Sequence, residues 1–150
     1  MRMRRYEDLL LWQKAMELAK IVYLLQKGLP KEEVYDLGDQ IRRAVISVPS
    51  NIAEGFGRGS DAEFKRFLSI SRGSLFEVKT QLQLAESIGL LIVDEEVWHL
   101  IEEVGKLING LVKRLAVSGW RWHFWQGLWY RWIVEREIVR MKKRVLKGLG

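Results

Sequence analysis

Apolar residues recur at alternating steps of three and four in four separate segments, and this spacing constrains the fold of the chain more than any other feature. Such steps place side chains on one stripe of an α-helix, and their alternation gives a period of about 3.5 residues. No segment shows the two-residue alternation of a half-buried strand. The four stripes are Leu11, Ala15, Leu18, Val22 and Leu25; Val34, Leu37, Ile41, Ala44 and Val48; Phe64, Leu68, Ser71, Leu75, Val78, Leu82 and Ala85; and Val97, Ile101, Val104, Ile108, Leu111 and Leu115.

Four helices with one apolar stripe each bury all of their stripes by packing together, and short connections make neighbouring helices antiparallel. The sequence therefore predicts an all-α fold, an antiparallel up-down four-helix bundle over residues 1–117, followed by a C-terminal helical extension over residues 118–150. No run of residues approaches the roughly 18 apolar residues that a membrane span needs. A cytoplasmic protein without a membrane span is the expectation.

Several residues predict where the helices begin, end or bend. Asp8 is a candidate cap for the first helix, and Ser60 with Glu63 has the spacing of a capping box for the third. Gly89 is the expected C-terminal glycine of that third helix. Pro49 removes a backbone donor inside the second apolar stripe, so a kink or a break is expected there.

Small residues occupy positions inside the last two predicted helices where larger ones are expected. Each interior glycine costs about 1 kcal/mol relative to alanine. One explanation is a close approach of helices inside one bundle, and the other is a close approach between subunits. The positions are Ser69, Ser71, Gly73, Ser74, Gly105 and Gly110.

The sequence offers no complete catalytic, metal or cofactor site. Cysteine is absent, which excludes disulfides, cysteine nucleophiles and thiolate metal sites. The glycine-rich residues 55–60 lack both the preceding strand of a dinucleotide fingerprint and the Gly-Lys-Ser/Thr of a P-loop. Glu96 and His99 form a single E-x-x-H, whereas di-iron bundles need two copies and two further glutamates. We therefore predict a non-enzymatic protein with no cofactor and no metal.

The last part of the chain differs sharply from the rest in charge. Residues 1–117 hold 17 Lys and Arg against 17 Asp and Glu, so the net charge of +6 lies entirely in residues 118–150. That segment also holds five of the seven tryptophans. Three interpretations remain open: packing as a fifth helix or along a neighbouring subunit, contact with nucleic acid or a membrane surface, or an extension without function.

The second predicted helix carries polar residues within an otherwise apolar stretch. A polar network that fixes the helix register is one interpretation, and a ligand or RNA contact is the other. The network candidates are Gln40, Ser47, Asn51 and Glu54. A patch of basic residues that binds phosphates is a further hypothesis, with the basic residues of the extension as a second cluster. The candidates for this patch are Arg42, Arg43, Arg58, Lys65, Arg66 and Arg72.

The same stretch resembles the signature of a known family. The string QIRRAVISVPSNIAEGFGR at residues 40–58 is similar to that of the four-helix proteins encoded by intervening sequences in bacterial 23S ribosomal RNA genes. Further matches are LWQKA at residues 11–15, Phe64, FL at 67–68, GSLFE at 73–77 and GLL at 89–91. The resemblance covers roughly residues 5–116, and the extension after Ser118 departs from the pattern.

The resemblance implies an antiparallel four-helix bundle, commonly a homopentamer, in association with ribosomal RNA. Its pentameric relatives include accessory proteins of diversity-generating retroelements, which bind a reverse transcriptase and RNA. We therefore expect a homo-oligomer, with five copies, that contacts RNA or a ribonucleoprotein. One alternative is a purely structural oligomer or protein-binding adaptor, such as an accessory-type partner of a reverse transcriptase. Another is an enzyme or ligand-binding bundle that uses Asn51 and Glu54.

Overall fold

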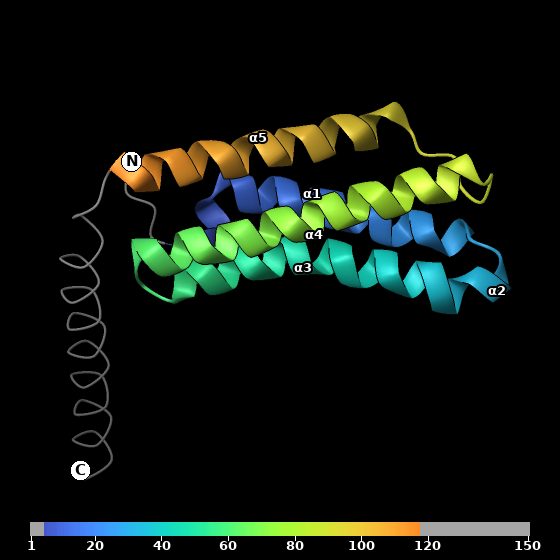
Figure 1. The fold of residues 1–150 in the computed structure, drawn as a ribbon, viewed down its shortest axis with the longest axis horizontal. Helices are drawn as coiled ribbons and strands as arrows, with labels where there is room; N and C mark the ends of the chain where they lie inside the picture. Colours follow the sequence, from blue (N-terminus) through green and yellow to red (C-terminus); the bar gives the residue numbers. More distant parts are fainter. Residues whose placement is uncertain (1–4, 118–150) are drawn as a thin grey trace, which may run out of the picture. The chain divides into compact units, whose positions relative to one another are not determined.

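The computed structural model describes residues 5–117, which contain four long helices (Figure 1). No strand occurs in this range, so the predicted all-α fold of four helices is confirmed. The expected helical extension over residues 118–150 lies outside the described residues. The long helices are α1 (Leu10–Leu25), α3 (Asp39–Gly57), α4 (Asp61–Ser87) and α5 (Glu95–Val117).

The helices form a bundle in which each one packs against two others. Helix α1 packs on α3 and α5, and α4 also packs on α3 and α5, so that α1 and α4 occupy opposite corners. Along the bundle, α1 and α4 run in one direction while α3 and α5 run in the other (Figure 1). This arrangement is the up-down topology that short connections predict.

The core consists of the four apolar stripes. Nearly all of their members are buried, and Leu18, Ile41 and Leu82 have no exposed surface. Leu25, Leu37 and Leu111 are partly buried and pack against the core from its edge. The 3.5-residue spacing thus identified the inward face of each helix correctly.

The region predicted as the second helix, which follows the turn after α1, forms three consecutive helical pieces between residues 31 and 57. A 3₁₀ turn, η2 (Gln26–Gly28), follows α1, and a single turn, α2 (Lys31–Glu33), leads into a π-helical segment, η3 (Val34–Gly38). Helix α3 begins directly after it. The wider π turn changes the rotation of the chain before α3 enters the core.

Of the kink or break predicted at Pro49, the break is wrong, because α3 is continuous from Asp39 to Gly57. Pro49 is itself buried, and Val45, Val48 and Ile52 on either side of it have no exposed surface. Packing on both sides holds the two halves of the helix against the core, which offsets the lost backbone hydrogen bond.

The cap predicted at Asp8 is also wrong. Residues 6–8 form a 3₁₀ turn, and Leu9 is the N-cap of α1 with no side-chain hydrogen bond. Asp8 is the last residue of this turn, so it does not occupy the N-cap position of α1. At the other end of the bundle, Gly89 has a φ of +74° and Leu90 N donates to Ala85 O at 2.8 Å, so the predicted glycine stop after α4 is confirmed.

Candidate nucleic-acid interface at the α3–α4 hairpin

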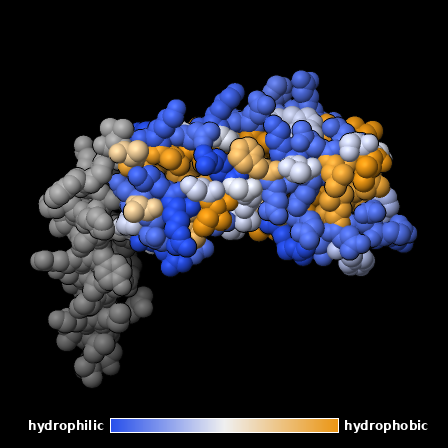
Figure 2. Space-filling view, in the orientation of Figure 1, coloured by the Kyte–Doolittle hydropathy of each residue, from blue (hydrophilic) through white to orange (hydrophobic). Residues whose placement is uncertain are grey.

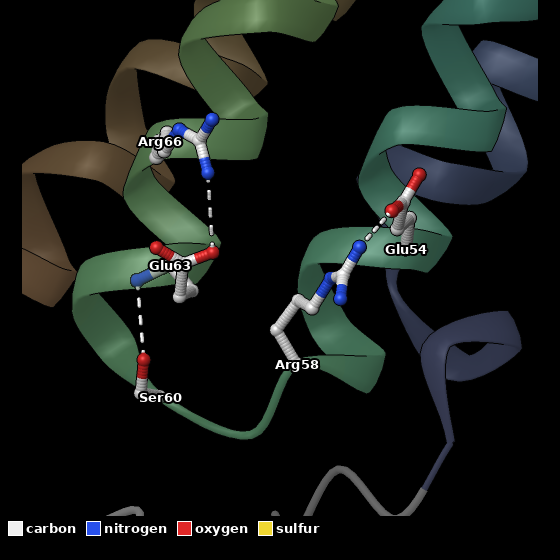
Figure 3. Close-up of polar contacts among 5 residues, drawn as sticks. All are labelled: Glu54, Arg58, Ser60, Glu63 and Arg66. Atoms are coloured by element: carbon white, nitrogen blue, oxygen red, sulfur yellow. Dashed lines mark hydrogen bonds and ion pairs between the residues drawn. The ribbon is translucent and has the colours of Figure 1, made fainter.

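A three-residue turn joins α3 to α4 and defines one end of the bundle (Figure 3). Gly59 has a φ of +75°, a conformation that favours glycine, and the chain then reverses into α4. Ser60 Oγ accepts a hydrogen bond from Glu63 N at 3.2 Å. The carboxylate of Glu63 pairs with Arg66 at 3.5 Å, so of the expected capping box only the Ser60 half is seen.

Replacing Ser60 with alanine is expected to lower the free energy of unfolding by about 1 kcal/mol, because the first turn of α4 loses the acceptor for a backbone N–H. Chemical denaturation followed by circular dichroism measures this change. The control is Ser69→Ala on the same helix, since Ser69 Oγ only donates to the carbonyl of Lys65 within the helix. An equal loss in both variants would contradict the cap.

Two arginines of the predicted patch meet over one aromatic ring at the hairpin. The guanidinium of Arg58 lies 5.3 Å from the centroid of Phe67, and that of Arg66 lies 5.8 Å from it. Arg58 also pairs with Glu54, one turn earlier on α3 (Figure 3). The ring of Phe67 makes cation–π contacts with both arginines. Because Phe67 is buried, its ring offers little surface to a stacked base. The sequence reasoning gave Phe67 no such role.

The six basic candidates do not form one patch. Arg42 pairs with Asp39 at the opposite end of α3, and Arg43 is exposed beside it. Arg43 and Arg58 are fifteen positions apart, which corresponds to about 22 Å along a helix. Arg72 instead faces α5, where its Nη1 donates to Asn109 Oδ1 at 3.3 Å. The structure therefore groups Arg58 with Arg66, and Lys65 directly precedes Arg66 in the sequence of α4.

The ion pairs at the hairpin are exposed and therefore weak. The side chains of Arg58 and Glu54 are about half exposed, at 51% and 50%, and those of Arg66 and Glu63 at 66% and 43%. Pairs of this kind contribute about 0.2–1 kcal/mol and are screened by salt. A phosphate can consequently replace either carboxylate at small cost. The N-terminus of α4 adds the positive end of a helix dipole, although Asp61 and Glu63 in its first turn already offset part of that charge.

The polar residues of α3 meet partners from α4 at the contact between the two helices. Asn51 Nδ2 donates to both the carbonyl oxygen and the Oγ of Ser47, each at 2.8 Å. Ser47 Oγ lies 2.9 Å from Ser74 Oγ, and Ser71 Oγ donates to the carbonyl of Val48 at 2.9 Å. We call Ser47, Asn51, Ser71 and Ser74 the polar seam, because the bonds of Ser71 and Ser74 join α4 to α3.

The other two network candidates lie outside the polar seam. Gln40 is exposed on α3, and Glu54 turns outward to Arg58. Asn51 and Glu54 therefore do not meet, and the ligand-binding hypothesis that joined them has no support from the geometry. Ser71 and Ser74 were noticed in the sequence only for their small size, although Ser71 occupies a position within an apolar stripe.

Within residues 5–117, no group of three or more His, Cys, Asp or Glu side chains could hold a metal ion. His99 is exposed, and its Nε2 lies 3.5 Å from Glu95 Oε1 on the same helix. No helix in the described part of the chain is both long and apolar enough to cross a membrane.

Comparison with known proteins identifies the family of the chain. No curated protein matches it. A family model described as 23S rRNA-intervening sequence protein matches residues 7–110, which include all of α1, α3 and α4 and most of α5. The matched range and the four-helix bundle agree with the resemblance seen in the string at residues 40–58. The chain therefore belongs to the 23S rRNA-intervening sequence protein family.

Proposed function

We propose that the protein is a non-enzymatic, homo-oligomeric scaffold of five copies that contacts RNA or a ribonucleoprotein in the cytoplasm. The primary contact consists of Arg58, Lys65 and Arg66 at the α3–α4 hairpin. Arg42, Arg43 and Arg72 would contact more distant phosphates, since they lie elsewhere on the bundle. The polar seam between α3 and α4 would keep the hairpin rigid.

The observation that carries this proposal is the pair of guanidinium groups held over Phe67 at 5.3 and 5.8 Å. A guanidinium presents planar N–H donors that match two phosphate oxygens at once. The buried ring fixes both cations at the surface, so that less side-chain freedom is lost on binding. The family name also links these proteins to ribosomal RNA genes.

The bundle of a single copy, residues 1–117, is expected to bind RNA weakly. Residues 1–117 have no net charge, so the bundle exerts no long-range attraction on a polyanion. Assembly changes this balance, because a second contact on the same RNA becomes intramolecular once the first has formed. Five hairpins in one particle would therefore bind an RNA that one hairpin cannot retain.

We expect the double variant Arg58→Gln, Arg66→Gln to weaken RNA binding and to flatten its salt dependence. The slope of the logarithm of the binding constant against the logarithm of the salt concentration should decrease in magnitude by about one for each phosphate that a protomer no longer neutralises. Fluorescence anisotropy with a labelled fragment of 23S ribosomal RNA, measured for the full chain from low to moderate salt, gives this slope.

The matched control is Lys106→Gln, Lys113→Gln, which removes the same charge from exposed positions on α5. This variant should bind RNA like the unmodified chain. Equal weakening in both variants would mean that only the total charge matters and would contradict the hairpin site. Absence of RNA binding at low salt would contradict the RNA function itself.

A second function, a purely structural oligomer or a protein-binding adaptor, is favoured by one observation. Four of the six basic candidates already have partners within the chain, namely Arg42, Arg58, Arg66 and Arg72. A protein of this kind, for example an accessory-type partner of a reverse transcriptase, would assemble normally and show no RNA binding in the same measurement.

A further inference from the structure

Helix α4 exposes a row of apolar residues on the side that faces away from the core. Phe76 is 60% exposed, Leu84 is 49% exposed and Ile70 is 41% exposed. With the exposed Gly73 and Thr80 they recur at steps of three and four, so they share one helix face. We call these five residues the α4 stripe. Figure 2 shows apolar patches among polar residues on the surface of the bundle.

A second exposed apolar row lies on α1, at the opposite corner of the bundle. Leu24 is 52% exposed, and Met16 and Tyr23 are also exposed. These three residues are called the α1 stripe. Among the described residues, α5 has no exposed large apolar side chain and α3 has only Ile46. The exposed apolar surface of the long helices is thus concentrated on the two corners that do not touch each other.

Within residues 5–117, no neighbouring atom explains why Gly73 is a glycine. A Cβ placed on it would meet no atom within 4 Å, whereas one on Gly105 would meet Leu75 at 3.6 Å. An exposed glycine inside a helix costs about 1 kcal/mol relative to alanine. The flat surface that it leaves in the α4 stripe is suited to a large side chain from outside the chain. Of the two explanations for the interior glycines, contact between subunits fits Gly73, whereas a Cβ on Gly105 would make only an ordinary contact with Leu75.

Charges beside the two stripes are complementary. Lys20 lies on the exposed face of α1 between Met16 and Leu24, and Glu77 lies on the exposed face of α4 beside Phe76. Within residues 5–117, neither side chain has an ion pair or a hydrogen bond. Opposite charges without local partners at the margins of two apolar rows are typical of a polar rim around an interface.

The two stripes also lie at similar levels along the bundle. Lys14 of α1 lies 3.6 Å from Glu103 of α5, and two residues further along α5 Gly105 faces Leu75 of α4. Lys14 and Leu75 are therefore within roughly one helical turn of the same level. Because α1 and α4 run in the same direction, the residues that follow them advance together (Figure 1). Lys20 therefore lies at about the same level along the bundle as the region from Glu77 to Leu84.

We infer that the α1 stripe of one copy packs in parallel against the α4 stripe of the next copy. Met16 would lie over Gly73, Lys20 would pair with Glu77, and Leu24 would contact Leu84. The inference rests on the assembly proposed above and names the surfaces that build it. Because the two surfaces differ, the contact is heterologous, and each copy keeps one free stripe until a ring closes.

The steric test is Gly73→Leu, which fills open space in its own chain and blocks the proposed partner. Light scattering after size exclusion, performed on the full chain over a range of concentrations, should show a shift from oligomer to monomer. Gly110→Leu is the matched control, since a Cβ there also meets nothing within 4 Å but α5 exposes no large apolar side chain among the described residues. This control should retain the mass of the unmodified oligomer.

The electrostatic test uses Lys20→Glu and Glu77→Lys. Each single change should weaken assembly by about tenfold, because it places like charges together, and the double change should restore it. Thermal unfolding followed by circular dichroism shows that the variants remain folded. An unchanged mass in Gly73→Leu and in both single variants would overturn this interface but leave the proposed assembly standing. A monomeric unmodified protein would overturn both.

Discussion

Replacing Gly55 with alanine is expected to lower the free energy of unfolding by about 1–3 kcal/mol, although alanine is the better helix former. An ideal Cβ at this position would lie 2.5 Å from Phe67 Cβ and 3.0 Å from Phe64 Cδ2. The Cβ of Phe67 is attached directly to the backbone of α4 and cannot rotate away. The two helices must therefore separate at their closest approach, and the surrounding core packs less tightly.

Thermal and denaturant unfolding of the full chain at one fixed concentration measure this loss of stability, since assembly also shifts the apparent stability. Gly110→Ala provides the control. It makes the same substitution in the middle of α5, where a Cβ would meet nothing within 4 Å, and should raise stability by up to about 1 kcal/mol. Gly55→Ala becoming as stabilising as Gly110→Ala would show that α3 and α4 do not approach this closely.

The helices and their inward faces could be predicted because they depend on local physics. A step of three or four residues fixes a helix face whatever the partner, and burial of Leu18, Ile41 and Leu82 followed from that spacing. Gly89 was equally predictable, since a glycine after an apolar row is the usual stop of a helix. These features needed no knowledge of which helix packs on which.

Gly55 shows why other features could not be predicted. In the sequence it begins a glycine-rich run and reads as part of a turn, yet in the structure it lies inside α3 against Phe64 and Phe67. Only the register between α3 and α4 reveals its role. The polar seam was missed in part for the same reason, because Ser71 and Ser74 bond across the helix pair to Val48 and Ser47.

For the basic candidates, the spacing of opposite charges in the sequence could have predicted their ion pairs. Each of the three local ion pairs joins residues three or four apart: Asp39 with Arg42, Glu54 with Arg58, and Glu63 with Arg66. Such spacing places opposite charges side by side on a helix. It was therefore foreseeable that these arginines are paired. The gathering of Arg58 and Arg66 over one ring was not foreseeable, because the two residues come from different helices.

Replacing Leu68 with alanine should produce the largest loss of stability, about 2–5 kcal/mol, because its side chain has no exposed surface and the cavity that it leaves cannot collapse completely. Leu68 belongs to the inward face of α4, close to the hairpin. Leu10→Ala makes the same change at a side chain that is 54% exposed, and should alter stability by less than about 1 kcal/mol. Denaturant unfolding of both variants at one protein concentration gives the comparison. Similar losses in the two would mean that Leu68 does not lie in a packed core, and the four-helix arrangement would have to be revised.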